Sequence, residues 1–347
     1  MGEKIYGKTF EVVSCSLEDA PESNEIQVSL GGNMDGCRIG FDLGGSDRKC
    51  AAVIDGEVVH SEEVEWDPYF QSDPQYHFDG IMDSLTRAAS KMPRVDAIGG
   101  SAAGVYVDNC PRVASLFRGV NDEDFQKHVI NMFRDIQKKF DNVPMIIAND
   151  GDVTALAGAI SMETVGVLGI AMGTSEAVGY VNANGNITDW LNELAFSPVD
   201  YRDDAPADEW SGDIGCGAQY FSQQCIARLA PAAGFDFEAG MPFPEQLIKV
   251  QEAMAAGDER AEKIYRTVGT YFGYAIAFYA EFYDIHNLLI LGRVTSGKGG
   301  DLILSGAAEI LKQEFPELAE KITFRTPDEK FKRHGQAVIA ASLPALG

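Results

Sequence analysis

Residues 38–66 read RIGFDLGGSDRKCAAVIDGEVVHSEEVEW and predict three strands joined by two tight turns. Apolar residues at Ile39, Phe41 and Leu43 alternate with other residues before the first turn, and a second apolar run, 50–54, follows it. Asp55-Gly56 is a strong signal for a two-residue hairpin into the third strand. The glycine-rich turn therefore joins antiparallel strands. That excludes the P-loop and the dinucleotide-binding motif, because in both of these a helix follows the glycines.

The turn itself is a candidate anion site. Gly44, Gly45 and Ser46 leave room for backbone N–H groups to approach a phosphate. Lys49 would add a positive charge, and Asp42, which ends the first strand, would hold a metal ion that bridges phosphates. On this stretch alone, a plain hairpin without a ligand is the competing interpretation.

A second stretch repeats the pattern. Residues 165–187 read VGVLGIAMGTSEAVGYVNANGNI, in which Gly173-Thr174-Ser175 takes the place of the first turn. The glycines at 44 and 173, the serines at 46 and 175, and the glycines at 56 and 185 are each 129 residues apart. Equal spacing at three positions indicates an internal duplication, the alternative being two unrelated meanders with coincident turns. Two such turns facing each other would grip a polyphosphate from opposite sides.

Composition limits the function classes. The 347 residues include 53 Asp and Glu against 28 Lys and Arg, a net charge of −25, which repels nucleic acid and acidic membrane surfaces. The six cysteines form no CxxC pair, which is typical of reduced thiols. No apolar stretch is long enough to span a bilayer, and the N-terminus lacks the apolar core of a signal peptide. We therefore expect a cytoplasmic protein.

Strands and helices alternate along the chain, which predicts an α/β protein of two similar domains with a cleft between them. We expect an N-terminal extension (1–37), a smaller domain (38–150 with the closing helix 335–347) and a larger domain (151–334). Finer expectations are a strand pair of 11–16 with 25–30, one amphipathic helix over 122–140 capped by Asp122, and a buried aromatic stripe in the helix 259–283.

Asp150 is the candidate catalytic residue. It follows the predicted strand 144–148 and precedes the helical run 153–162, so a helix cap is the simpler interpretation. In the functional interpretation, Asp150 takes the proton from a substrate hydroxyl and Asn149 orients the same substrate. Phosphoryl transfer to an alcohol needs mainly positioning, charge neutralisation and one such base.

The order of these motifs resembles the ROK family (repressors, open reading frames and kinases), whose sugar kinases belong to the hexokinase/actin-type ATPase superfamily. The resemblance covers residues 38–347 and rests on five strings in order: DLGGSDRK, IIANDGDVTALAGA, GIAMGTSEAVG, LLILGRV and GQAVIAASL. It implies two duplicated actin-like (ribonuclease H-like) domains. It also implies Asp150 as general base toward the sugar 6-hydroxyl, Asp42 near Mg²⁺ through water, both turns at the phosphates of ATP, and Gly292 and Arg293 near the nucleoside.

Two departures from the family pattern affect the substrate and the metal. The family's Glu-x-Gly-His stretch reads Glu193-Leu194-Ala195-Phe196 here, so Glu193 remains a candidate sugar ligand and the histidine is lost. Of the family's CxCGxxGC zinc loop, the stretch 211–216 keeps GxxGC, which ends in Cys216, and loses the preceding cysteines. A single thiol cannot build a tetrahedral zinc site, so we expect no zinc and read Cys216 and Cys225 as buried thiols.

The leading hypothesis is an ATP-dependent, glucokinase-like hexose kinase that uses Mg-ATP. The alternatives are a non-catalytic sugar sensor descended from such a kinase, and a kinase for an amino sugar or another polyol. We expect a small-molecule sugar and ATP as partners, neither nucleic acid nor membrane, and a homodimer by the same resemblance.

Overall fold

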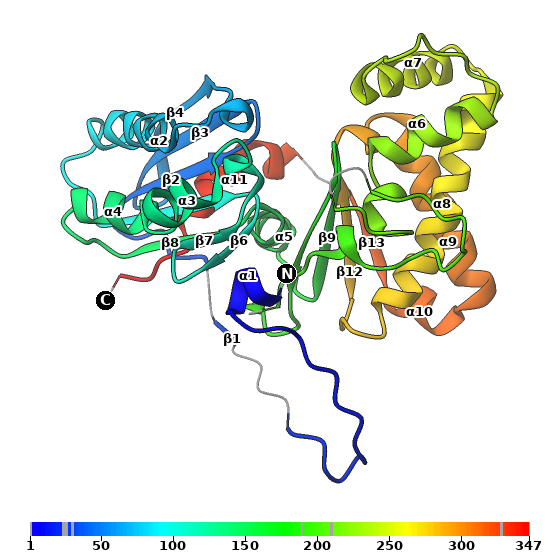
Figure 1. Ribbon diagram of the computed structural model, residues 1–347, viewed down its shortest axis with the longest axis horizontal. Helices are drawn as coiled ribbons and strands as arrows, with labels where there is room; N and C mark the ends of the chain where they lie inside the picture. Colours follow the sequence, from blue (N-terminus) through cyan, green and yellow to red (C-terminus); the bar gives the residue numbers. More distant parts are fainter. Residues whose placement is uncertain are drawn as a thin grey trace. The chain divides into compact units, whose positions relative to one another are not determined.

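The computed structural model describes residues 2–22, 27–28, 31–188, 190–208, 211–326 and 329–346, and of residues 27–28 and 329–334 only the backbone. The chain divides into two compact units (Figure 1). Unit 1 comprises Met1–Ile160, Asn186–Leu191 and Phe331–Gly347, and unit 2 comprises Ser161–Gly185 and Asn192–Lys330. The division follows residue 160, ten residues after the boundary proposed from the sequence.

Unit 1 is built on a five-stranded sheet of order β4-β3-β2-β5-β8. Its strands are β2 (Cys37–Leu43), β3 (Asp47–Ile54), β4 (Glu57–Glu65), β5 (Ala97–Ala102) and β8 (Met145–Asn149). The predicted meander is confirmed, because β2 pairs antiparallel with β3 and β3 with β4. On its other side β2 is parallel to β5, and β5 is parallel to β8. The carboxyl ends of β2, β5 and β8 therefore share one edge of the sheet.

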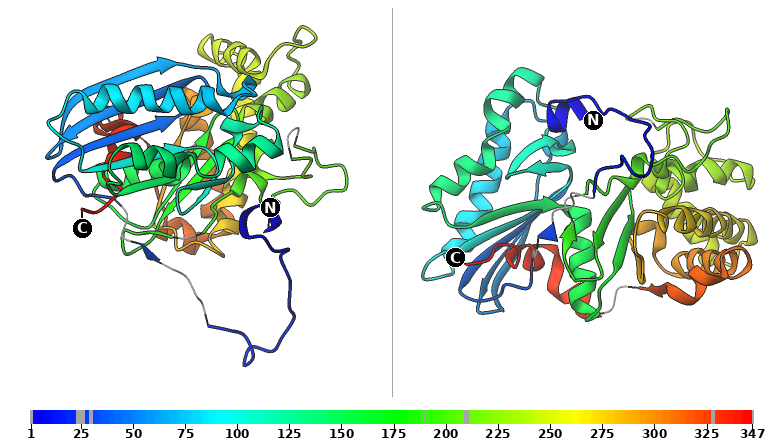
Figure 2. Two further views of the ribbon diagram at one scale, coloured as in Figure 1. Left: turned by 60° about the vertical axis from the view of Figure 1, so that its left-hand side comes forward. Right: turned by 90° about the horizontal axis from the view of Figure 1, so that it is seen from below.

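Helices cover both faces of this sheet (Figure 2). They are α2 (Pro74–Ala89), α4 (Met132–Lys139), α5 (Asp150–Ser161) and α11 (Glu329–Ala341). The core on one face joins Ile39 and Phe41 of β2 to Leu85 of α2 and Phe133 of α4. On the other face α11 lies directly on the backbone, because a Cβ on Gly40 would lie 1.7 Å from the Ala337 carbonyl oxygen. This close approach explains the small residues at the end of the chain.

Three local expectations for unit 1 are wrong. The helix predicted over 122–140 is α3 (Asp122–Asp124), a π-helical segment η3 (Phe125–Val129) and α4, and its N-cap is Asn121, whose side chain accepts from the Asp124 N–H. Residues 11–16 form no strand, and β1 (Gln27–Val28) pairs with β11 (Ile187–Thr188). The short elements α1 (Gly2–Tyr6), β6 (Val105–Val107) and β7 (Cys110–Val113) complete the strands and α-helices of unit 1.

Unit 2 repeats the arrangement around strands in the order β10-β9-β12-β13. The strands are β9 (Val167–Met172), β10 (Glu176–Val181), β12 (Asn287–Leu291) and β13 (Thr323–Arg325). β9 is antiparallel to β10 and parallel to β12, as β2 is to β3 and β5. The helices are α6 (Gln223–Ala232), α7 (Phe243–Ala255), α8 (Glu259–Tyr279), α9 (Lys298–Glu314) and α10 (Pro316–Lys321). The same strand order in both units supports the duplication inferred from the turns.

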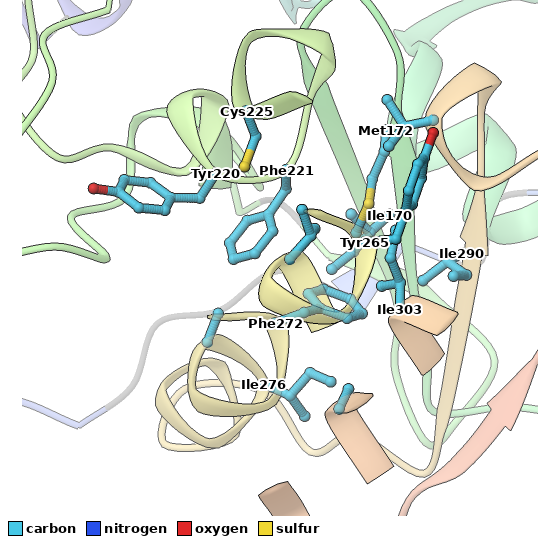
Figure 3. Packing of buried hydrophobic residues seen from close by; sticks show 14 of the residues in the cluster. Ile170, Met172, Tyr220, Phe221, Cys225, Tyr265, Phe272, Ile276, Ile290 and Ile303 are labelled. Atoms are coloured by element: carbon cyan, nitrogen blue, oxygen red, sulfur yellow. The ribbon is translucent and has the colours of Figure 1, made fainter. Parts of the chain in front are cut away.

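The core of unit 2 lies between β9 and helices α6, α8 and α9 (Figure 3). Tyr265, Phe272 and Tyr279 of α8 are buried in it, as expected for an aromatic stripe. Two other aromatic residues of the predicted stripe are not core, because Tyr274 is 48% exposed and Phe282 is 61% exposed. In the parts of both units that the structure describes, no helix has the length and apolar character needed to cross a membrane.

Candidate active site

The first glycine-rich turn, between β2 and β3, is fixed through its backbone. The Gly44 N–H donates to the Asp47 carbonyl at 2.9 Å, and the Trp66 indole N–H donates to the Gly44 carbonyl at 2.8 Å. Gly45 must be small, because a Cβ there would lie 2.4 Å from the Tyr69 ring. Among the described residues, none accepts a hydrogen bond from the N–H of Gly45 or Ser46. The turn therefore offers two backbone donors to an anion.

Lys49 is tied to this turn through its neighbour. Its Nζ lies 3.0 Å from Asp47 Oδ1, and its side chain is partly exposed. Partial burial lowers the pKa of Lys49, but the hydrogen bond and charge of Asp47 raise it by more. Lys49 therefore stays protonated and forms an ion pair with Asp47.

Asp42 ends β2 and lies in register with Ser101 at the end of β5. Both side chains are buried, and the Ser101 hydroxyl donates to Asp42 Oδ1 at 2.7 Å. Burial raises the pKa of Asp42 to about 6; the Ser101 hydrogen bond opposes this shift, and the negative charge of Asp150 adds to it. The charge of Asp150 therefore acts on Asp42 at one edge of the sheet. Ligands of α/β proteins commonly bind at this edge, outside the carboxyl ends of parallel strands.

Asn149 ends β8 and Asp150 begins α5. The contacts of their side chains separate the helix-cap interpretation from the catalytic one. Asn149 takes the cap position, since its Oδ1 accepts from the Gly151 N–H at 2.7 Å and its Nδ2 donates to the Gly104 carbonyl at 2.9 Å. Asp150 Oδ1 accepts a longer bond of 3.1 Å from the same N–H. Burial raises the pKa of the Asp150 carboxyl, against the effect of its backbone hydrogen bonds. A carboxylate with a raised pKa is a stronger base toward an alcohol.

The sequence interpretation missed Ser101 and Tyr106, which surround these acids. The Tyr106 hydroxyl donates to the Ala103 carbonyl at 3.2 Å, and burial together with the charge of Asp150 raises its pKa. Both residues come from the stretch GGSAAGVY at 99–106, which is rich in glycine and alanine and was assigned no role from the sequence. Its residues 99–102 are the last four of β5. A signal was present, because parallel strands that follow one another in a sheet end at the same edge.

The second turn, Gly173–Ser175, joins β9 to β10 in unit 2. The Gly173 N–H donates to the Ser175 carbonyl at 2.9 Å, and the Gly173 carbonyl accepts from the Gln223 N–H at the start of α6 at 2.9 Å. Thr174 and Ser175 are exposed, and their N–H groups have no acceptor within the described part of unit 2. This turn offers the same kind of anion site as the first.

Glu176 follows the second turn and was not predicted as special. It is 4% exposed, and neither of its carboxyl oxygens has a hydrogen-bond partner in the described structure. Burial raises its pKa to about 8. The carboxyl lies against Gly217, where a Cβ would be 2.3 Å from Glu176 Oε2. An unpaired buried carboxyl next to a turn is unusual enough to need a physical account.

The candidate sugar ligand Glu193 lies just before a short 3₁₀ helix, η4 (Leu194–Phe196), and its carbonyl accepts from the Phe196 N–H at 3.1 Å. Ala195 and Phe196 pack against Cys216 and Ala218. Cys216 and Cys225 are buried and free, as expected, and burial raises the pKa of both thiols. In the described ranges no three His, Cys, Asp or Glu side chains come together to hold a metal ion. The absence of zinc stays a prediction.

Gly292 and Arg293 follow β12. Gly292 has a φ of +102°, and a Cβ on it would lie 2.4 Å from the Met172 carbonyl oxygen. Only glycine therefore lets this backbone approach the end of β9, just before the second turn. Arg293 is exposed, and its carbonyl accepts from Gln251 Nε2 at 2.8 Å. The structure thus brings the second turn and Gly292 together in unit 2, and Asp42, Lys49, Asn149, Asp150 and the first turn together in unit 1.

No protein-family model matches the sequence, and no curated protein is detectably similar to it. Solved structures match over most of the chain. The ROK hexokinase of Thermus thermophilus superposes with a TM-score of 0.67 at 16% identity, over 89% of this chain and 97% of that one. The glucokinase of Streptomyces griseus, solved with glucose and AMPPNP, superposes with a TM-score of 0.61 at 19% identity, over 89% and 99%.

The chain has the ROK fold. A ROK-family transcriptional regulator described as a homologue of the E. coli MLC protein superposes almost as well, with a TM-score of 0.66 at 16% identity over 89% of this chain and 79% of that one. The ROK fold therefore includes both kinases and regulators. Kinases and regulators superpose on this chain about equally well, so the residues of the site have to distinguish the two functions.

Proposed function

We propose that this chain is a ROK-family member and an ATP-dependent sugar kinase, with Asp150 as general base. The observation that carries the proposal is the pair of acids at the carboxyl ends of β2 and β8, Asp42 and Asp150, which lie close enough for the charge of Asp150 to raise the pKa of Asp42. Unit 1 also carries one backbone turn with free N–H donors, and unit 2 carries the second. A phosphoryl-transfer enzyme needs these parts: a base for the alcohol, a cation ligand and donors for phosphate oxygens.

In the proposed reaction the sugar hydroxyl gives its proton to Asp150 while its oxygen attacks the γ-phosphorus of ATP, and ADP leaves. The Asn149 side chain bonds Gly104 and Gly151, so it holds the start of α5, and with it Asp150, in place. Glu193 is the proposed sugar ligand in unit 2, and the N–H groups at 45–46 and 174–175 are the proposed phosphate donors.

Mg²⁺ fits the residues present in unit 1. Asp42 offers a buried carboxylate whose Oδ1 is bonded by Ser101, while no described residue donates a hydrogen bond to its Oδ2. Hard carboxylate oxygen is the donor that Mg²⁺ prefers, and it usually keeps several of its waters. A bound Mg²⁺ would neutralise phosphate charge, and Asp42 would hold it directly or through water. The cytoplasmic location and the homodimer stay predictions, and the sugar panel described next has to identify the sugar.

The deciding experiment incubates the purified chain with Mg-ATP and a panel of hexoses, amino sugars and polyols, and measures ADP. We expect ADP formation with at least one sugar. We also expect Asp150→Asn to lower kcat by about 10²- to 10⁴-fold while sugar and nucleotide still raise the melting temperature. Stabilisation of the wild type by a sugar without any ADP would indicate the sensor alternative. Near-normal turnover by Asp150→Asn would refute the assignment of the base.

A further inference from the structure

Unit 2 contains a cavity of about 470 Å³ to which neither the sequence motifs nor the proposed function assigns a role. A cavity of this size can take a small organic molecule. One wall comes from the loop after η4, one from the segment before α6, and one from the second half of α8. The lining residues are Pro198, Val199, Asp200, Tyr201, Arg202, Tyr220, Phe221, Tyr271, Tyr274, Ala275 and Phe278. None of them belongs to the candidate phosphate, sugar or nucleoside residues.

The walls of this α8 cavity are held in place by polar contacts. The Tyr220 hydroxyl donates to Asp200, and Arg202 binds both oxygens of the same carboxylate, at 3.2 and 3.0 Å from Nε. Burial raises the pKa of Asp200, but the hydrogen bonds from Arg202 and Tyr220 lower it to about 2, so it remains a carboxylate. Tyr220 packs edge-on against Tyr271 with ring centroids 5.4 Å apart. Figure 3 shows the Tyr220 ring directed away from the core residues Phe221 and Phe272.

The two charged residues of the lining, Asp200 and Arg202, neutralise each other, and the segments that carry the lining are acidic in sequence. Residues 198–222 contain six carboxylates and one arginine, and residues 267–284 on the α8 side contain no lysine or arginine. The whole chain carries −25. Aromatic rings present negative faces, so the rings of the lining and the acidity of the chain favour a cation over an anion. One ring of the cavity already binds a cation, because the Arg228 guanidinium lies 4.6 Å from the centroid of Tyr220.

We propose that the α8 cavity binds an organic cation, an alkylated ammonium group that packs on the tyrosine and phenylalanine rings. Cages of aromatic side chains recognise such cations through the ring quadrupole and by burying the alkyl groups. Among the described lining residues, Arg202 is the only cation, and it is held by Asp200. It is therefore an internal competitor for the ligand, and its removal should strengthen binding.

The experiment is calorimetric titration of the full chain, without ATP or sugar, with choline and with 3,3-dimethyl-1-butanol, its uncharged isostere. We expect choline to bind about tenfold more tightly than the alcohol. Equal affinities, or no heat from choline, would overturn the proposal. Because no nucleotide or sugar is present, failure here leaves the proposed kinase activity untouched.

Matched variants locate the site and determine its charge preference. Phe278→Ala should weaken choline binding at least fivefold, whereas Phe70→Ala, which removes a 76% exposed ring of unit 1, should leave it within twofold. Arg202→Gln should strengthen choline binding, because it frees the Asp200 carboxylate. Weaker binding in Arg202→Gln, or equal losses in the two phenylalanine variants, would contradict a cation site in this cavity. Arg202 is well exposed, so this variant should fold.

Discussion

The two glycine-rich turns share a backbone frame but differ in their acids. At the spacing of 129 residues, Asp47 of unit 1 corresponds to Glu176 of unit 2. Asp47 is partly exposed, lies 3.0 Å from Lys49 Nζ and accepts from the Ser46 hydroxyl. Glu176 is buried without a described partner. The duplicated position has kept an acid and changed its surroundings, so a repeat in sequence does not repeat the chemistry.

The two units also differ at the carboxyl ends of their parallel strands, where only unit 1 has a polar pair in the described register. In unit 1 the register pairs Asp42 with Ser101, and in unit 2 the corresponding row pairs Ala171 with Leu291. The polar row therefore exists in unit 1 only. It follows that the two copies have separated their roles: unit 1 carries the acids at the strand ends, and unit 2 keeps a turn whose nearest acid is shielded from water.

The largest effect is expected from Glu176→Gln. The pKa of Glu176 is raised from 4.5 to about 8, so the folded state holds this proton more tightly than the unfolded state does. Its contribution to stability is full below pH 4.5 and is lost as the pH rises to 8, a loss of about 5 kcal/mol at most. A glutamine side chain does not titrate over this range, so its contribution to stability does not change with pH. The melting temperature of Glu176→Gln relative to wild type should therefore rise steadily from pH 5 to pH 8.

Asp47→Asn is the matched control for that series. Because the Asp47 carboxylate faces Lys49 and solvent, its replacement should shift the melting temperature by a similar amount at both pH values. Parallel melting curves for wild type and Glu176→Gln at all pH values would show that the Glu176 carboxyl is not kept protonated by the fold.

The next largest effect is expected on catalysis, when a residue at the end of β2 is compared with its counterpart at the end of β9. Asp42→Asn removes the negative charge proposed to hold Mg²⁺ and should lower kcat about 10²-fold, the size of losing one electrostatic stabiliser. Ala171→Ser, at the corresponding position of unit 2, should leave kcat within threefold. Steady-state assays at saturating Mg-ATP measure both. Equal losses in the two variants would mean that the rows have not separated their roles.

A smaller effect should come from exchanging residues between the turns. Gly45 faces the Tyr69 ring, which Arg118 covers at 3.9 Å, whereas its counterpart Thr174 is exposed. Gly45→Thr should therefore destabilise the protein by about 1–3 kcal/mol, and Thr174→Gly by less than about 1 kcal/mol. Thermal unfolding compares the two. If the clash is the cause, Tyr69→Ala should reduce the cost of Gly45→Thr in a double-mutant cycle.

The glycine-turn meanders of both units could be predicted from the sequence. Alternating residues and turn glycines gave both meanders, because strand period and turn geometry are local properties. The aspartate after β8 was found in the same way. The division of the helix predicted over 122–140 was not found, since its apolar spacing is compatible with an unbroken helix and carries no sign of the π-helical segment.

The partners of the site residues could not be predicted, for a different reason. Ser101 bonds Asp42 across 59 residues, and the glycine at 217 meets the carboxyl of Glu176 across 41. Such contacts depend on parallel register and on loop packing, which no window of sequence contains. The exposure of Tyr274 and Phe282 was missed because an aromatic stripe has the same spacing whether its residues face the core or the surface.

The smallest effect is expected at Ser101, and it tests whether the polar row of unit 1 is a working unit. Ser101→Ala removes a buried 2.7 Å hydrogen bond to Asp42 and should cost about 1–2 kcal/mol of stability, whereas Ser175→Ala, on the exposed second turn, should cost less than about 0.5 kcal/mol. The Ser101 hydrogen bond lowers the pKa of Asp42, so its loss should raise that pKa further. The stability lost in Ser101→Ala should then be greater at pH 8, where the wild-type hydrogen bond is to a carboxylate, than at pH 5. Thermal unfolding at the two pH values decides the matter: a loss that is the same at both would mean that Ser101 fills space beside Asp42 without stabilising its charge.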